Sequence, residues 1–107
     1  MAARPNPPKP SRDRLLPEAI TAFVKAHPRW RFADGSLTCS IQFKAYMDGI
    51  AFVNRVAELA EAANHHPDLV VTWRKVDITL TTHDAGGVTQ LDIDLAGRIE
   101  EFIGAAR

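Results

Sequence analysis

Residue types that transfer protons recur at fixed spacing in the second half of this 107-residue chain. Imidazole has an unperturbed pKa of about 6.5, so a histidine can both give and take a proton at neutral pH. Three of the four histidines lie here, in one constellation with two carboxylates, a proline and a tryptophan: Glu61, His65, His66, Pro67, Trp73, His83 and Asp92. The pattern predicts a site for general acid–base chemistry. The fourth histidine, His27, precedes a proline, where a loop or a helix end is expected.

Zinc binding is the alternative chemistry, because three imidazoles can form a catalytic zinc site. Consecutive residues on an extended chain point to opposite sides, so His65 and His66 are poorly placed to ligate one ion together. We therefore expect no metal. Two adjacent histidines on their own would indicate an exposed surface, and it is His83, expected to face them, that favours a functional site.

Three other members of the constellation have a structural interpretation beside the functional one. Glu61 is either an exposed helix residue or the partner that orients His65 one helical turn later. Trp73 is expected in the core rather than against a ligand, because its strand carries apolar residues on the same face. Asp92 is expected to cap a helix, and a capping carboxylate beside a histidine could also serve the site.

The positions of proline and of apolar residues predict how the chain begins. Residues 1–14 hold four of the seven prolines and four basic residues, a composition that cannot bury enough apolar surface to fold, so we expect a disordered tail. Residues 15–107 are then expected to form a single domain. The first helix is predicted from Leu16, with Pro17 in its first turn, to about His27.

A β-hairpin is predicted after this helix. Apolar and polar residues alternate on both sides of Asp34-Gly35, and Asp-Gly is a strong signal for a two-residue turn. With that turn the cross-strand pairs are apolar against apolar: Phe32 with Leu37, and Trp30 with Cys39. All the apolar side chains then lie on one face, so the register is self-consistent.

A long helix is predicted from Lys44 to Ala63. Its apolar residues fall on two stripes: Ile50, Val53, Ala57 and Ala60 on one, and Phe52, Val56, Leu59 and Ala63 on the other. A helix that is apolar on two sides needs burial on two sides, so we expect one side against the sheet and the other against a helix or a second subunit. Gly49 within the helix costs about 1 kcal/mol relative to Ala, which indicates close packing against a neighbour.

A second strand pair is predicted from Leu69 to Trp73 and from Val76 to His83. With Arg74-Lys75 as the turn, the facing pairs are again apolar: Trp73 with Val76, Val71 with Ile78, and Leu69 with Leu80. The same register brings His66 opposite His83, and directly opposed residues have Cβ atoms about 5 Å apart. Pro67 cannot donate a ladder hydrogen bond, so pairing is expected to end there and the site to open as a cleft.

The last helix is predicted to begin at Thr89, after the flexible Gly86-Gly87 segment. Thr89 and Asp92 have the spacing of a capping box. The buried face of this helix is expected to hold four apolar side chains: Leu95, Ile99, Phe102 and Ile103. Two hairpins with a helix between them and a helix on either side predict an α+β fold of order α-β-β-α-β-β-α. We expect a four-stranded antiparallel sheet with three helices packed on one face.

Charge and composition narrow the class of partner. Thirteen basic and thirteen acidic residues cancel, so no net field favours nucleic acid or an anionic membrane. No apolar run approaches the ~18 residues of a membrane span, and the start of the chain lacks the apolar core of a signal peptide. Cys39 is the only cysteine, which excludes an internal disulfide and favours a reducing compartment. We expect a cytoplasmic protein that binds neither nucleic acid nor membrane.

The constellation resembles the signature of the pterin-4a-carbinolamine dehydratases, also known as dimerization cofactors of a homeodomain transcription factor. The matching segments are Glu61-Ala-Ala-Asn-His65-His66-Pro67, then Trp73, then Thr81-Thr82-His83-Asp84, then Asp92-Ile93-Asp94-Leu95-Ala96. Weaker likeness extends upstream through Trp30, so the resemblance covers about residues 15–104. Two segments depart from it: Leu69-Val70 stand where an aromatic pair is common, and Asn64 where an acidic residue often stands. These departures bear on the shape of the pocket and not on the proton chemistry.

The resemblance implies a reaction and a role for each residue. The substrate would be 4a-hydroxytetrahydropterin (4a-hydroxytetrahydrobiopterin), which aromatic amino acid hydroxylases produce. Loss of water from it would give quinonoid dihydropterin without a redox cofactor or a metal. His65 and His83 would be the catalytic acid and base, in either order, and His66 would grip the pterin. The substrate-binding residues would be Glu61, Asn64, Thr81, Thr82, Asp84 and Asp92.

The resemblance also implies self-association as a homodimer or homotetramer, with an aromatic amino acid hydroxylase as a candidate partner. A second function is left open, that of a non-catalytic module that dimerizes with a transcription factor. In that case the hydrophobic helix surface would carry the function and the histidines would be incidental. The complete set of histidines favours the enzyme.

Overall fold

The computed structural model describes residues 13–106, with side chains up to residue 103. Its elements are α1 (Pro17–Ala26), β1 (Trp30–Ala33), β2 (Ser36–Gln42), α2 (Tyr46–Ala63), β3 (Asp68–Thr72), β4 (Lys75–Leu80), a 3-10 turn η1 (His83–Ala85) and α3 (Gln90–Ala106). The predicted α-β-β-α-β-β-α order is confirmed. The predicted tail, residues 1–14, lies outside the described residues except for its last two. None of the helices in the described range is long and apolar enough to cross a bilayer.

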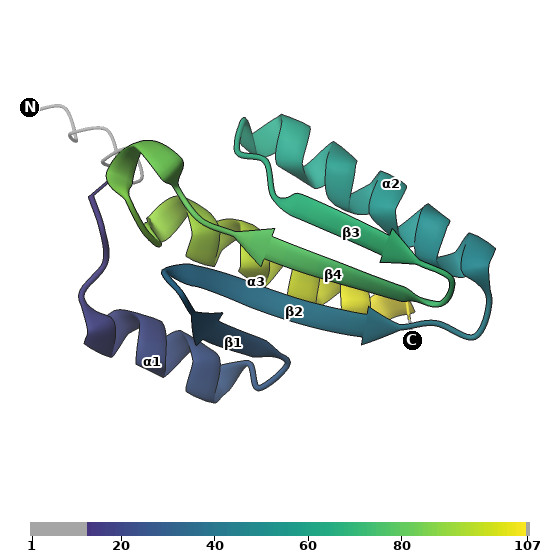
Figure 1. Ribbon diagram of the computed structural model, residues 1–107, viewed down its shortest axis with the longest axis horizontal. Coiled ribbons are helices and arrows are strands. Elements are labelled where there is room, and N and C mark those ends of the chain that lie inside the picture. Colours follow the sequence, from purple (N-terminus) through teal and green to yellow (C-terminus); the bar gives the residue numbers. More distant parts are fainter. Residues whose placement is uncertain (1–12, 107) are drawn as a thin grey trace, which may run out of the picture.

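Four antiparallel strands form one sheet in the order β1-β2-β4-β3. Figure 1 shows α2 and α3 behind this sheet and α1 beside β1. The two central strands alternate between buried apolar and more exposed polar side chains, and the buried ones are Leu37, Cys39, Ile41, Val76, Ile78 and Leu80. All three helices contribute residues to the core that covers this face. The predicted α+β fold is therefore confirmed.

The β1–β2 hairpin has the predicted register. The two predicted pairs are present, Trp30 with Cys39 and Phe32 with Leu37. Asp34 and Gly35 form the turn with φ of 52° and 76°, which are the left-handed conformations that a type I′ turn requires at both positions. Phe32 is 48% exposed although it shares the core face, because β1 is an edge strand. The Asp-Gly signal thus fixed this hairpin correctly.

The β3–β4 hairpin differs from the predicted register. Its turn is Trp73-Arg74 rather than Arg74-Lys75, and its apolar pairs are Leu69 with Ile78 and Val71 with Val76. The difference is a slip of two residues, which leaves every side chain on its own face of the sheet. Apolar alternation therefore could not distinguish the two registers, and the choice depended on a turn sequence that carries no Gly, Asn or Asp.

The end of this hairpin corrects a second expectation. The last ladder pair is Asp68 with Thr79, directly after Pro67, so the predicted end of strand pairing is confirmed. The predicted opposition of His66 and His83 across the ladder is wrong. In the structure the strand ends at Leu80, and His83 begins η1.

Trp73 also lies outside its predicted place. It stands in the hairpin turn and is 71% exposed, so the expectation that it belongs to the core is wrong. The guanidinium carbon of Arg74 lies 4.1 Å from the centre of its ring, in cation–π contact. The residue follows Thr72, whose pair with Lys75 is the ladder pair nearest the turn, so no sheet face remains to bury it.

Helix α2 buries a single line of residues, Gly49, Phe52, Val56 and Ala60. This line draws on both predicted stripes, while Val53 and Leu59 beside it are half-buried and Ala57 is exposed. The predicted close packing at Gly49 is confirmed, because a Cβ added there would lie 3.4 Å from Phe43 Cδ2 and 3.5 Å from Val76 Cγ2. The start of α2 therefore lies close against β4.

The single cysteine is a packing residue. Cys39 is buried in the core, and this burial, followed by the charge of Glu100, raises the pKa of its thiol to about 12. A thiol with so high a pKa stays protonated at neutral pH and is a poor nucleophile. We therefore place no chemistry at Cys39.

Candidate acid–base site

The histidine pair begins where α2 ends. Asn64 closes the helix with left-handed backbone angles (φ 50°, ψ 41°), a conformation that Asn adopts more readily than most residues. The N–H of His65 then donates to the carbonyl of Ala60 at 3.1 Å. The chain leaves the helix axis at this point, and His65 and His66 lie in the short link to β3.

His65 is buried and paired with a buried carboxylate. Its Nε2 lies 2.5 Å from Asp92 Oδ1, and Asp92 is fully buried in the first turn of α3, where the helix dipole favours negative charge. The other oxygen, Oδ2, accepts hydrogen bonds from Thr89 N–H at 2.9 Å and from Thr82 Oγ1 at 2.8 Å. Asp92 therefore caps the helix and contacts a histidine, as its place in the sequence suggested.

His66 has a carboxylate of its own at the surface. Its Nε2 lies 2.5 Å from Glu61 Oε1, and both side chains are mostly exposed. Of the two interpretations of Glu61, the exposed helix residue is correct, and its histidine partner is His66 rather than His65. Exposed ion pairs contribute only about 0–1 kcal/mol to stability, so this pair orients a ring more than it supports the fold.

The chain beyond β4 forms a tight turn that carries the third histidine. The N–H of Thr82 donates to Gly87 O at 3.0 Å, and the Thr82 carbonyl accepts from three backbone N–H groups of the same turn. The hydroxyl of Thr81 donates to Gly35 O at 3.0 Å, which ties the turn to the β1–β2 hairpin. His83 is exposed at the start of this turn. Backbone hydrogen bonds therefore set the position of its Cα.

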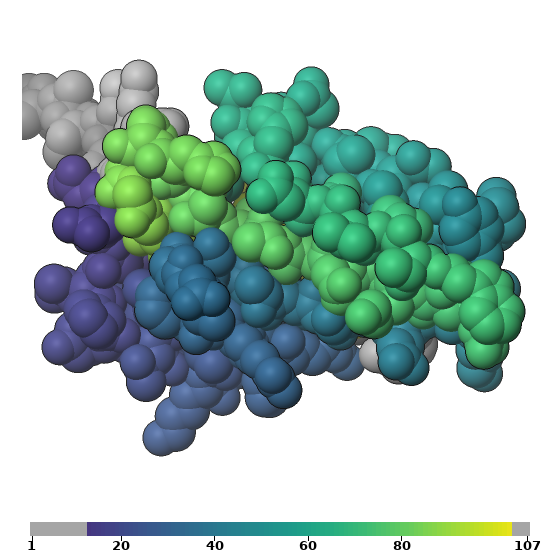
Figure 2. All heavy atoms as spheres, in the orientation of Figure 1, coloured from purple at the N-terminus to yellow at the C-terminus, as the bar shows by residue number. Residues whose placement is uncertain are grey.

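One small cleft brings these segments together. It has a volume of about 230 Å³ and is lined by Asn64, His65, His66, Thr81, Thr82, His83 and Asp84. Figure 2 shows the two segments, teal before β3 and light green after β4, side by side at one end of the molecule. The three predicted catalytic histidines and four of the six predicted binding residues line it. The other two, Glu61 and Asp92, reach it through their histidine partners.

Two histidines of this cleft are each paired with a carboxylate. Within residues 13–103, no group of three or more His, Cys, Asp and Glu side chains is arranged to hold a metal ion. Nε2 of His65 and Nε2 of His66 contact different carboxylates, one buried and one exposed. This arrangement can orient two imidazoles separately for proton transfer.

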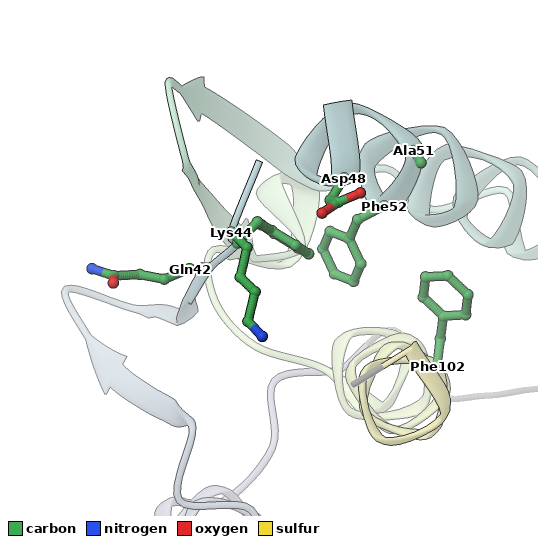
Figure 3. A pocket seen from close by; sticks show the side chains of 7 residues that line it. Gln42, Lys44, Asp48, Ala51, Phe52 and Phe102 are labelled. Atoms are coloured by element: carbon green, nitrogen blue, oxygen red, sulfur yellow. The ribbon is translucent and has the colours of Figure 1, made fainter. Parts of the chain in front are cut away.

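A larger pocket lies at the opposite end of the sheet, beside the start of α2 and the end of α3 (Figure 3). We call this pocket the aromatic groove. Its volume is about 560 Å³, and its lining residues are Gln42, Phe43, Lys44, Asp48, Ala51, Phe52 and Phe102. Figure 3 shows Phe52 and Phe102 projecting from two helices toward one another, and their ring centroids are 5.7 Å apart. The groove contains no histidine, so it offers apolar contact rather than proton transfer.

Fold and cleft together define a small α+β protein with a histidine–carboxylate site at one end of its sheet. The family model for pterin 4 alpha carbinolamine dehydratase matches residues 13–102 of the sequence. The chain therefore belongs to this family, and the resemblance found in its signature residues is confirmed.

Individual relatives give the same result. A protein from a Picosynechococcus strain, provisionally named a pterin-4-alpha-carbinolamine dehydratase, is 44% identical over 89 residues, which is 83% of this chain and 97% of that protein. A solved structure, a transcriptional coactivator/pterin dehydratase from Brucella melitensis, matches with a TM-score of 0.79 at 32% identity, over 83% of this chain and 97% of that one. A second solved structure has a TM-score of 0.58 at 26% identity, over 70% of this chain and 89% of that one. It is a pterin dehydratase-like protein identified as a RuBisCO assembly factor in the alpha-carboxysome.

Sequence reasoning missed the hydroxyl group that joins the two sides of the site. Thr82 Oγ1 lies 2.8 Å from Thr89 Oγ1 and 2.8 Å from Asp92 Oδ2. Thr89 was predicted only as a helix cap, and that cap is present, with Leu91 N–H donating to its hydroxyl at 3.2 Å. The spacing of Thr82 and Thr89 carries no signal of its own, because their contact depends on how the turn between them closes.

Proposed function

We propose that this protein dehydrates 4a-hydroxytetrahydropterin to quinonoid dihydropterin and so recycles the pterin of aromatic amino acid hydroxylases. The observation that carries the proposal is the buried His65–Asp92 pair in the wall of a cleft that also holds His83. A carboxylate that fixes the orientation of an imidazole is a common device for preparing histidine to transfer protons.

The reaction requires two proton transfers and needs neither an oxidant nor a reductant. One proton is delivered to the oxygen of the C4a hydroxyl group as the C4a–O bond breaks and water leaves. Another is removed from N5, and the electron pair of that N–H bond forms the double bond between N5 and C4a. General acid and general base catalysis each typically contribute about 10²- to 10⁴-fold. Two positioned imidazoles therefore suit this chemistry.

We assign the base to His65 and the acid to His83. The Asp92 carboxylate only accepts hydrogen bonds, so Nε2 of His65 carries the hydrogen and Nδ1 of the neutral ring is the acceptor left for N5–H. The imidazolium that forms is then stabilised by Asp92 beside it. His83 is exposed at the mouth of the cleft, where solvent can return its proton after each turnover.

The remaining cleft residues would hold the pterin ring. His66, oriented by Glu61 at the rim, would grip the ring from the exposed side. Asn64, Thr81 and Asp84 line the same cleft and offer polar groups to the heteroatoms of the ring. Among the remaining expected binding residues, Thr82 and Asp92 are buried behind His65.

The test is the rate at which purified protein accelerates dehydration of freshly generated 4a-hydroxytetrahydropterin. The variant His83→Ala should lose most of this acceleration, about 10²-fold or more, while its circular dichroism stays that of the wild type. His27→Ala is the matched control, because His27 packs on Phe23 outside the cleft. Wild-type turnover in His83→Ala would contradict the assignment.

A binding-module function is the second candidate, and a surface feature favours it. Five large apolar side chains are exposed near the β3–β4 turn and the start of α2: Tyr46, Met47, Val70, Val71 and Trp73. The backbone N–H of Phe43 donates a hydrogen bond to the carbonyl of Arg74 at 2.8 Å, and this bond holds the two segments together. If the wild type, with a normal circular dichroism spectrum, fails to accelerate dehydration, this surface becomes the functional one.

The assembly and location of the protein belong to the same proposal. The exposed apolar side chains support a homodimer or homotetramer, which sedimentation equilibrium would measure directly. An aromatic amino acid hydroxylase would be the source of substrate, and copurification with such an enzyme would test a direct contact. The reducing, cytoplasmic location expected from the single cysteine would be tested by cell fractionation.

A further inference from the structure

Thr82 uses all of its polar groups inside the protein. Its N–H donates to Gly87 O, its carbonyl accepts from the backbone of the η1 turn, and its hydroxyl donates to Asp92 Oδ2 at 2.8 Å. The residue is only 1% exposed. Although Thr82 lines the cleft, it has no hydrogen-bonding group left over for a ligand.

The direction of the hydrogen bonds around Thr82 follows from counting protons. A threonine hydroxyl has one proton, and Thr82 gives its proton to Asp92 Oδ2. The 2.8 Å contact between Thr82 Oγ1 and Thr89 Oγ1 must then be donated by Thr89. Thr89 Oγ1 in turn accepts from Leu91 N–H. A single chain of donors therefore runs from the first turn of α3 through two hydroxyl groups to the carboxylate.

This chain divides the two oxygens of Asp92 between two tasks. Oδ2 receives the Thr82 hydroxyl and Thr89 N–H, and Oδ1 faces Nε2 of His65 at 2.5 Å. Three donors on one carboxylate fix both its position and its plane. Thr82, Thr89 and Asp92 are almost completely buried, and hydrogen bonds are stronger in such a low-dielectric setting.

We propose that Thr82 is a positioning residue that acts on His65 through Asp92, rather than a residue that binds substrate. Its hydroxyl holds Oδ2, so that Oδ1 stays aligned with the imidazole. The effect on catalysis rests on the proposed dehydratase function, whereas the effect on the His65 ring does not. Removing the outer partner of a metal-ligating histidine typically costs about 10- to 100-fold in activity, and we expect a loss of the same order for this carboxylate-oriented histidine.

The test compares two substitutions at position 82. Thr82→Val keeps the shape of the side chain and removes the donor, and Thr82→Ser keeps the donor and removes a methyl group. The matched control is Thr79→Val, because Thr79 is a half-buried residue of β4 on the face of the sheet away from the core, three positions before Thr82. If Thr82→Val does not fold, Thr82→Cys replaces it, because a thiol is a weaker donor of similar size.

The first measurement is steady-state kinetics of the dehydration. We expect kcat of Thr82→Val to fall by about 10- to 100-fold with KM within about twofold of wild type, and Thr82→Ser and Thr79→Val to stay near wild type. A loss that appears in KM with kcat unchanged would overturn the proposal, because it would indicate that Thr82 binds substrate. Unchanged kcat in Thr82→Val would overturn it as well.

The second measurement needs no substrate and therefore separates this proposal from the proposed function. The ring nitrogen and Nε2–H resonances of His65 are followed by NMR, in a cleft that also holds His66 and His83. If Thr82 holds Asp92 in place, the downfield Nε2–H signal of the hydrogen bond to Asp92 Oδ1 should be weakened or lost in Thr82→Val and return in Thr82→Ser. Wild-type ring resonances in Thr82→Val would refute the positioning role, even in a protein that shows no dehydratase activity.

Discussion

The two ends of the sheet have opposite chemistry. At one end the histidine cleft is small, about 230 Å³, and two of its histidines, His65 and His66, are each paired with a carboxylate behind or beside the cleft. At the other end the aromatic groove is larger, about 560 Å³, and its walls are mainly phenylalanine rings and aliphatic stems. Size and chemistry therefore do not coincide. Histidines oriented by carboxylates line the smaller cleft and no histidine lines the larger groove, and for this reason we propose the cleft as the reactive site.

The largest expected effect is on the cleft, in the variant Asp92→Asn. The amide oxygen can still accept from Thr82 and Thr89, so the helix cap survives, but the amide nitrogen then donates toward His65 and forces the other ring tautomer. We expect kcat to fall by about 10²- to 10⁴-fold with little change in the unfolding midpoint. Kinetics together with urea denaturation would check both parts. A near-normal kcat in Asp92→Asn would contradict the claim that the histidine cleft, and not the aromatic groove, carries the chemistry.

A smaller effect, on stability instead of rate, is expected in the aromatic groove for Phe52→Ala. Phe52 is buried and contacts the rings of both Phe43 and Phe102. Removing a buried phenylalanine ring typically costs about 3–5 kcal/mol of unfolding free energy. We expect such a loss by urea denaturation, with kcat per folded molecule unchanged. A selective fall in kcat would mean that the groove takes part in the chemistry.

The smallest effect is expected for Trp73→Ala at the turn of the β3–β4 hairpin. Its ring is mostly exposed and contacts the guanidinium of Arg74, an interaction worth about 0.5–1 kcal/mol at exposed sites. We expect the unfolding free energy to fall by no more than that amount and the dehydration rate to stay constant. A much larger destabilisation, measured on the monomer, would contradict the exposed position of the ring.

The sequence predicted the fold where local chemistry selected one structure. Asp34-Gly35 has a strong preference for a type I′ turn, and the register of the first hairpin followed from it. Arg74-Lys75 has no such preference, and a slip of two residues buries the same side chains, so the second register was predicted incorrectly and Trp73 with it. Alternation of period two determines a face, whereas only the turn determines the register.

The histidines of the site were predicted correctly to lie together, but the contact that brings them together differs from the predicted one. His66 and His83 were expected to meet as opposed residues of a ladder, but they share a cleft because the chain turns back on itself after β4. The spacing of Thr89 and Asp92 revealed the cap, since a capping box is local in sequence. The contact of Asp92 with His65 joins residues 27 positions apart, and that of Thr82 with Asp92 depends on the same tertiary closure. Tertiary contacts of this kind follow from the packed fold and cannot be found from spacing alone.

The most direct test of the central claim is the dehydration rate of 4a-hydroxytetrahydropterin, measured by stopped flow with the wild type and with His65→Ala in parallel. The wild type should accelerate the reaction, and His65→Ala should lose about 10²- to 10⁴-fold of that acceleration while its circular dichroism is unchanged. Equal rates for the two proteins, or no acceleration by a folded wild type, would contradict the claim that the histidine cleft is the reactive end of the molecule.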